Sequence, residues 1–122
     1  MIGSADFTPR LLRAAGAVMA AVAVALAAYA SHGADALVRG NLQTAALFAF
    51  GHGLALSTLA RGSQSRLALL ALAMLLVGAL VFCGALVARS LFGATSAPAP
   101  VGGMVMILGW LLYAVAALRD RG

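Results

Sequence analysis

The sequence predicts an all-α protein, an integral-membrane bundle of four antiparallel helices. Two observations support this fold class. Of the 122 residues, 64% are hydrophobic and 9% are charged, and the mean hydropathy is +1.06, so an ordinary water-soluble surface cannot cover the apolar side chains. Four uncharged stretches also approach the roughly 20 residues that a membrane-spanning helix needs. At this length, residues 1–122 are expected to form one transmembrane domain.

The four helices are expected at residues 10–31, 42–60, 66–89 and 101–119. Thr8 and Pro9 predict the N-cap and first turn of the first helix, because proline loses nothing where the amide has no helical partner. Asn41 is the expected N-cap of the second helix. Between them, Asp35 and Arg39 form an i,i+4 pair that suits either a short interfacial helix or a plain loop.

The remaining connections are marked by turn residues. Gly62 and Ser63 interrupt the second connection, which is so short that the second and third helices must form an antiparallel hairpin. The third connection, residues 93–100, contains two prolines, which stop any helix from running through it.

The arginines predict an orientation. Six of the eight fall on one side of the four-helix arrangement: Arg10, Arg13, Arg61, Arg66, Arg119 and Arg121. Arg39 and Arg89 fall on the other side, so the positive-inside rule places both termini in the cytoplasm. The arginines are scattered between apolar runs without interleaved aromatic residues. This pattern indicates anionic lipid headgroups and no nucleic acid as partner.

Small residues predict where the helices meet, because helices in lipid associate through close approach and a few hydrogen bonds. Three stripes qualify: Ala17, Ala21 and Ala25 in the first helix, Ala45, Ala49, Gly53 and Ser57 in the second, and Gly102, Gly109 and Ala116 in the fourth. The glycines of the fourth helix are the stronger signal. A glycine inside a helix costs about 1 kcal/mol relative to alanine, which close packing can offset.

His52 is the main candidate for a functional residue. It is the eleventh residue of the predicted second helix, about 16 Å from its outer end and close to the bilayer midplane. Ionisable groups at that depth are costly and are candidates for function. A neutral imidazole, however, needs only one donor and one acceptor, and Trp110 and Tyr113 of the fourth helix are expected at similar depth. Two roles are therefore open for His52. It either has a structural role, through a hydrogen bond between helices, or it binds a ligand or transfers protons.

Three polar residues near the outer surface are further candidates. His32 follows the first helix. It is expected either to act as a cap or to form an interfacial hydrogen bond near Asp35, or else to form a pH-sensitive contact to a partner. Gln43 and Thr44 begin the second helix and either hold the outer connection or line a shallow vestibule.

No pattern typical of an enzyme is present. The sequence contains no phosphate loop, nucleophile elbow or metalloprotease helix. His32 and His52 differ in depth by most of half a bilayer, so we expect no metal site and no cofactor between them. Cys83 is expected to be a buried hydrophobe and not a nucleophile. The three acidic residues lie outside the predicted spans, which counts against a proton-coupled pump: Asp6, Asp35 and Asp120.

Four blocks of the sequence resemble one protein family. They are "AYASHGADAL" at residues 28–37, "LQTAALFAFGHGLAL" at 42–56, "LVFCGAL" at 80–86 and "PVGGMVMILGWLL" at 100–112. In this order and spacing, the chain resembles the YgdD-like small inner-membrane proteins of bacteria, also called domain of unknown function 423, with transmembrane protein 256 as eukaryotic counterpart. The resemblance implies a four-helix protein of the bacterial inner membrane without assigned activity or established catalytic residues.

The resemblance carries over to eleven positions: His32, Gly33, Gln43, Thr44, His52, Gly84, Pro100, Gly102, Gly103, Gly109 and Trp110. This chain also departs from the family. The family usually has tyrosine and glutamine where this chain has Phe48 and Ala49, and serines where it has Cys83 and Ala85. If those polar groups form a network in the family, this chain has lost part of it.

Two functions follow as expectations, and an intramembrane enzyme is kept as a third only because the family lacks an assigned activity. The first is a non-enzymatic membrane protein that acts through helix contacts, either as a homo-oligomer or as an accessory subunit of a larger membrane complex. Its expected packing positions are Ala49, Gly53, Gly84, Gly102, Gly103 and Gly109. The alternative is a small channel or carrier for a lipid-like or small neutral solute, formed at an oligomer interface and lined by His52, Gln43 and Trp110.

Overall fold

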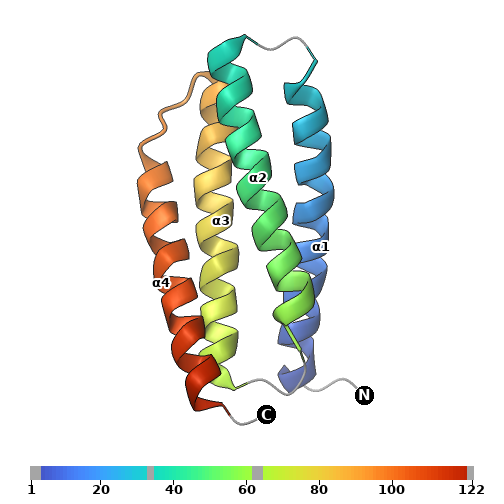
Figure 1. The fold of residues 1–122 in the computed structure, drawn as a ribbon, viewed down its shortest axis with the longest axis vertical. Coiled ribbons are helices and arrows are strands. Elements are labelled where there is room, and N and C mark those ends of the chain that lie inside the picture. The colour runs from blue at the N-terminus through green and yellow to red at the C-terminus, as the bar shows by residue number, and fades with distance from the viewer. Residues whose placement is uncertain (1–3, 33–34, 62–64, 121–122) are drawn as a thin grey trace.

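The computed structural model describes residues 4–32, 35–61 and 65–120. It contains helices α1 (Ser4–Ala30), α2 (Ala36–Leu59), α3 (Arg66–Phe92) and α4 (Pro98–Arg119), and these ranges contain no strand. All four helices are long and apolar enough to cross a membrane. Successive helices run in opposite directions, so α1 begins and α4 ends at the same end of the bundle (Figure 1). The predicted all-α, antiparallel four-helix fold is confirmed.

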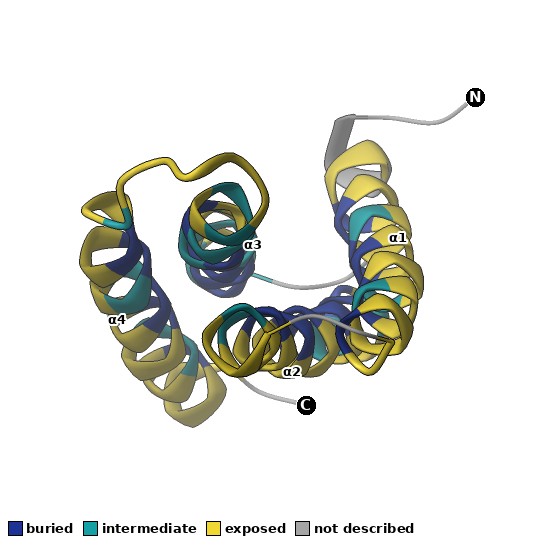
Figure 2. Cartoon of the chain, turned by 90° about the horizontal axis from the view of Figure 1, so that it is seen from above, coloured by how far each residue is buried: buried dark blue, intermediate teal, exposed yellow. Residues whose placement is uncertain are grey.

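The bundle consists of two hairpins and is not a closed square. Helix α1 packs along α2, and α3 packs along α4; the hairpins meet mainly through α2 and α3, with a smaller contact between α1 and α3. Within the described ranges, the backbone of α4 does not closely approach α1 or α2. Seen from above, α1 and α4 lie at opposite sides, with α2 and α3 between them (Figure 2). Exposed apolar residues cover the outward faces, which is the surface that membrane lipid contacts.

Two groups of buried side chains form the core. The larger one draws residues from all four helices: Leu12, Met19, Leu56, Ala60, Leu72, Leu75, Ala79 and Met106. The second consists of small residues from α1, α2 and α3: Ala23, Ala45, Ala49 and Cys83. Phe82 packs against both groups, so its ring joins the two parts of the core.

Helices α1 and α2 begin earlier than the sequence suggested. The predicted cap at Thr8–Pro9 is wrong, because α1 begins at Ser4 and Pro9 lies inside it, fully buried. The helix continues through Pro9 at the cost of the one hydrogen bond that the proline nitrogen cannot donate. Asn41 is not the cap of α2. The side chain of Asp35 accepts the Val38 amide hydrogen at 3.0 Å, which starts α2 at Ala36. The segment expected to be either a short interfacial helix or a plain loop therefore forms the first turns of α2.

The connection between α3 and α4 is shorter than predicted. Helix α3 extends to Phe92, where Gly93 takes the left-handed conformation (φ 69°) and donates its amide hydrogen to the Arg89 carbonyl at 3.1 Å. Helix α4 starts at Pro98 and not at residue 101. Both prolines of this segment fall in the first turn, where a missing amide hydrogen has no helical partner. The predicted turn residues Gly62 and Ser63 lie outside the described residues.

Ser65 joins α3 to the end of α4. Its hydroxyl oxygen accepts the amide hydrogen of Ala68 at 3.1 Å, which caps α3. The same hydroxyl donates to Asp120 Oδ2 at 2.7 Å, and Asp120 is the C-cap of α4. One small side chain therefore closes the start of one helix and holds the end of its neighbour.

We expect Ser65→Ala to lower the free energy of unfolding by about 1 kcal/mol, because the first turn of α3 loses its cap. Asp120→Asn keeps both the cap and an oxygen that can accept the serine hydrogen, so its effect should be smaller. Reversible unfolding in detergent, followed by circular dichroism, measures both. Equal stability of Ser65→Ala and the parent protein would contradict the role of this contact.

Candidate functional site

His52 forms a bridge between α2 and α4. It is 8% exposed and is the one buried polar side chain within the described ranges. Its Nδ1 atom lies 2.9 Å from the carbonyl oxygen of Phe48, one turn earlier in α2. Its Nε2 atom lies 3.1 Å from Nε1 of Trp110 in α4. Both nitrogens of the imidazole therefore have a partner.

These partners select one form of the imidazole. A carbonyl oxygen only accepts a hydrogen bond and an indole N–H only donates one. Nδ1 must therefore carry the proton and Nε2 must accept, which is a neutral tautomer. A second proton, on Nε2, would face the Trp110 N–H and remove that hydrogen bond. In this arrangement, His52 has no lone pair available for a metal or a ligand.

Aromatic rings surround this bridge. The Phe48 ring is stacked near His52, with centroids 6.1 Å apart, and meets Phe82 of α3 edge-on at 5.0 Å. On α4, Trp110 contacts Tyr113 at 6.3 Å, also edge-on. Tyr113 thus contacts Trp110 and does not take part in the hydrogen bond to His52. Because the backbones of α2 and α4 stay apart, these large side chains span the distance between them.

A glycine pair brings α1 and α2 into backbone contact. A Cβ atom at Gly16 would lie 2.5 Å from the Gly53 carbonyl oxygen, and one at Gly53 would lie 2.5 Å from the Gly16 carbonyl oxygen. Carbon atoms do not approach oxygen that closely, so neither position has room for a side chain. Gly53 was among the predicted packing residues. Gly16 was missed, although it is the one glycine of α1, where its cost relative to alanine is a usable signal.

A second glycine pair does the same for α3 and α4. A Cβ atom at Gly102 would lie 2.5 Å from the Phe82 nitrogen and 2.8 Å from the Gly78 carbonyl oxygen. One at Gly78 would lie 2.9 Å from the Gly102 carbonyl oxygen. Further along α4, a Cβ atom at Gly109 would lie 2.9 Å from Leu75 Cδ2. Gly102 and Gly109 lie where the sequence predicted close packing, and Gly78 was missed.

Other predicted packing positions differ in the structure. Ala49 is buried in the small-residue part of the core. Gly84 is exposed, and nothing lies within 4 Å of a Cβ atom built there, so its predicted packing role within the chain is wrong. Gly103 has ordinary contact distance only, 3.8 Å to Phe82 Cδ1.

The predicted stripe on α1 is also wrong, because its members face outward: Ala17, Ala21 and Ala25. The buried face of α1 instead includes Gly16, Met19 and Ala23. Cys83 is buried, and its thiol donates to the Ala45 carbonyl oxygen at 3.3 Å, which links α3 to α2.

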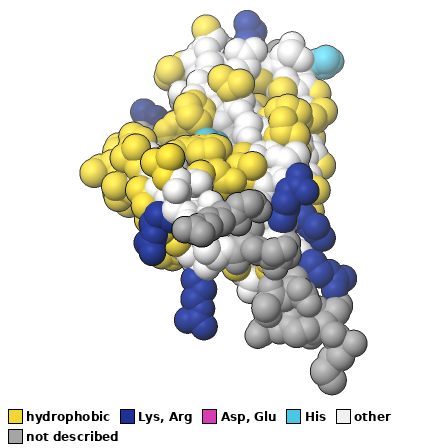
Figure 3. All heavy atoms as spheres, turned by 60° about the horizontal axis from the view of Figure 1, so that its bottom comes forward, with side chains coloured by type: hydrophobic (Ala, Val, Ile, Leu, Met, Phe, Trp, Pro, Cys, Tyr) yellow, Lys and Arg dark blue, Asp and Glu magenta, His cyan; other side chains and the backbone are white. Residues whose placement is uncertain are grey.

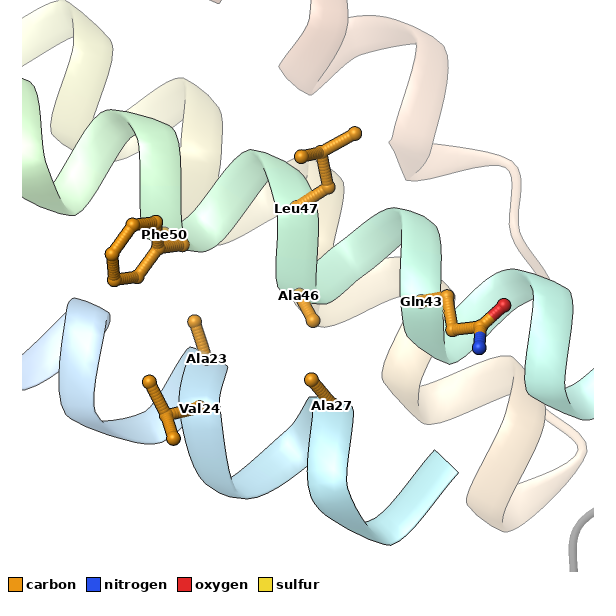
Figure 4. Close-up of a pocket in the computed structure, with 7 residues that line it drawn as sticks. All are labelled: Ala23, Val24, Ala27, Gln43, Ala46, Leu47 and Phe50. Carbon is orange, nitrogen blue, oxygen red and sulfur yellow. The ribbon is translucent and has the colours of Figure 1, made fainter. Parts of the chain in front are cut away.

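The remaining candidates lie apart from His52. His32 is exposed at the far end of α1, where its Nδ1 is 3.4 Å from the Ser31 hydroxyl, whereas Asp35 caps α2. Gln43 and Thr44 are exposed on α2. Gln43 lies at one end of a groove of about 440 Å³ between α1 and α2, which Figure 4 shows. The structure therefore joins His52 to Trp110 but does not bring His32, Gln43 or Thr44 to them.

The basic residues gather as predicted. Five exposed arginines lie at the end of the bundle where α1 begins and α4 ends: Arg10, Arg13, Arg61, Arg66 and Arg119. Figure 3 looks toward this end and shows arginine side chains projecting around it. Arg39 and Arg89 are exposed at the opposite end, and Arg121 lies outside the described residues.

Comparison with known proteins gives one family. The family model described as "Protein of unknown function (DUF423)" matches residues 26–103. The match includes His52 and the glycines at 53, 78 and 102, whereas Gly16 and Trp110 lie beyond it. No curated protein and no solved structure matches the chain.

Proposed function

The chain belongs to this family of proteins of unknown function (DUF423), and from that premise we propose that it is a non-enzymatic, multi-pass protein of the bacterial inner membrane that acts through helix contacts. It would serve as a homo-oligomer or as an accessory subunit of a larger membrane complex. The proposal rests mainly on His52. This deeply placed ionisable residue has both nitrogens occupied by Phe48 and Trp110, and thus holds two helices together.

The proposed orientation has both termini in the cytoplasm. It is supported by the arginines around the end of the bundle that contains the first turn of α1 and the last turn of α4. Basic residues near helix ends favour the cytoplasmic side, where they also meet anionic lipid headgroups.

A channel or carrier remains the alternative function. It requires His52, Gln43 and Trp110 to line a common path. The groove that Gln43 borders lies between α1 and α2, and its lining residues include neither His52 nor Trp110. The helix-contact function is therefore better supported by the geometry.

We expect the His52–Trp110 hydrogen bond to contribute about 1 kcal/mol to stability, the range found for interhelical hydrogen bonds in membrane proteins. Trp110→Phe removes the indole N–H and keeps an aromatic ring, and His52→Ala removes the acceptor. A double-mutant cycle of unfolding in detergent measures their coupling: the double variant should lose about 1 kcal/mol less stability than the sum of the two single variants. Additive effects of the two substitutions would contradict a structural hydrogen bond.

The same variants test the function in liposomes. We expect the parent protein, Trp110→Phe and His52→Ala to show equal glycerol permeability and equal flipping of a fluorescent phosphatidylcholine. A flux that the parent protein supports and that both substitutions abolish would overturn the proposal in favour of a carrier. Because Trp110→Phe is a mild change, it keeps the test decisive if His52→Ala does not fold.

A further inference from the structure

Gln43 is a polar side chain in an apolar part of α2, without a partner among the residues that the structure describes. Within the described part of α2, Ser57 and Thr58 donate to the Leu54 carbonyl oxygen, and His52 is satisfied on both sides. The side chains of Asn41, Gln43 and Thr44 have no hydrogen bond to a described residue, and Gln43 is the one of these that lines the groove between α1 and α2. The Gln43 amide is exposed and has no hydrogen bond to any described residue. The amide group has two N–H donors and one carbonyl acceptor, so it can form several hydrogen bonds with another molecule.

The depth of Gln43 makes this lack of a partner costly. Helix α2 begins at Ala36, so Gln43 lies about 10 Å along an axis that is about 36 Å long. The hydrocarbon layer is about 30 Å thick, which places the backbone of Gln43 inside it. An amide that forms no hydrogen bond there costs several kcal/mol. The position therefore favours a polar group supplied by another molecule.

The surface beside Gln43 is shaped for a helix. Small residues of both helices form the floor of the groove, namely Ala23, Ala27 and Ala46 (Figure 4). Leu47, which is 70% exposed, and Phe50 stand on its α2 side. Helices in lipid associate through such combinations of small residues and one polar contact.

We propose that a second copy of this chain docks on the α1/α2 face, with the two Gln43 amides hydrogen-bonded to each other. Copies inserted with the same topology hold Gln43 at the same depth. Since an amide both donates and accepts, Gln43 is complementary to itself across a twofold axis along the membrane normal. Leu47 of each copy then packs on the alanine floor of the other. This inference rests on the proposed function, from which it selects the homo-oligomer.

Cysteine cross-linking in native membranes tests the contact. In a Cys83→Ala background, Gln43→Cys should give a disulfide-linked dimer on oxidation. Met104→Cys is the control, because Met104 is exposed on α4, away from the α1/α2 face. It should give none. Cross-linking of Met104→Cys with none at Gln43→Cys would overturn the inference.

Native mass spectrometry from mild detergent gives a second readout. The parent protein should be a dimer, Gln43→Leu should dimerise about tenfold more weakly, and Gln43→Asn should stay close to the parent. Because Gln43 is exposed in the single chain, Gln43→Leu should keep its thermal stability as a monomer. An unchanged dimer in Gln43→Leu would contradict the inference. A monomer with a bound phospholipid that Gln43→Leu loses would also contradict it and assign the groove to lipid.

These outcomes are separate from a failure of the proposed function. That failure appears as a flux that depends on His52, whatever the number of copies. Loss of the Gln43 contact without such a flux would leave a helix-contact protein that uses another face.

Discussion

Replacing Gly53 by alanine should lower the free energy of unfolding by about 2 to 3 kcal/mol, the upper range for overpacking. The new methyl carbon would stand 2.5 Å from the Gly16 carbonyl oxygen and 2.9 Å from the Ala20 nitrogen. All of these neighbours are backbone atoms, which cannot turn aside as a side chain can. Helices α1 and α2 must therefore move apart along their contact.

Gly51 provides the matched control, two residues away in the same helix. Nothing lies within 4 Å of a Cβ atom at this position. Gly51→Ala should therefore leave stability unchanged or raise it by up to about 1 kcal/mol, because alanine is the better helix former. Reversible unfolding in mixed micelles, followed by circular dichroism, compares the two. Equal effects of Gly53→Ala and Gly51→Ala would show that the helices do not meet at the glycine pair.

Gly102→Ala should destabilise the second hairpin by a similar amount, about 2 to 3 kcal/mol. Its methyl carbon would lie 2.5 Å from the Phe82 nitrogen and 2.8 Å from the Gly78 carbonyl oxygen, again backbone atoms. A shift of α4 away from α3 would also move Trp110, which donates to His52. The indole fluorescence should therefore change together with stability.

Gly103 is the control for this hairpin, since it is the next residue of α4. A Cβ atom there would lie 3.8 Å from Phe82 Cδ1, which is ordinary contact distance. Gly103→Ala should keep the stability and the fluorescence of the parent protein. If Gly103→Ala were as damaging as Gly102→Ala, the loss would reflect any added methyl group on α4, and the backbone contact would not account for it.

The number and the approximate position of the helices could be predicted from the sequence, because burial in lipid demands long apolar runs. Their ends could not. Arg39 and Asn41 lower the hydropathy of the segment before Leu42, yet they are compatible with helix, and Asp35 starts it with a side-chain cap. Hydropathy measures which residues suit lipid, whereas caps decide where a helix begins.

The faces of contact were only partly predictable. In water, the apolar face of a helix marks its buried side, but in lipid both sides are apolar and the pattern loses this meaning. Alanine is so frequent in α1 that the stripe at Ala17, Ala21 and Ala25 looked as suitable as the true face beside it. Glycine is a better indicator, because a glycine inside a helix is destabilising unless it allows a close contact. Gly53 and Gly102 do lie at close backbone contacts, whereas Gly84 does not.

Depth alone reduced the possible side-chain partners of His52 to two. Two helices that run in the same direction place residues equally far from the membrane surface at similar height, which selected Trp110 and Tyr113 as candidates. The choice between them could not be made from the sequence, because it depends on the rotation of α4. The second partner, the Phe48 carbonyl oxygen, belongs to the backbone of α2 itself and carries no signal in residue type.

Accessibility labelling tests the central claim, a chain that crosses the membrane four times. Single cysteines replace Arg10, Ser31, Arg61, Thr95 and Arg119, all exposed near helix ends, in a Cys83→Ala background. An impermeant maleimide should label Ser31→Cys and Thr95→Cys on intact cells, and Arg10→Cys, Arg61→Cys and Arg119→Cys only after lysis. Labelling of any two successive positions from the same side would contradict four crossings.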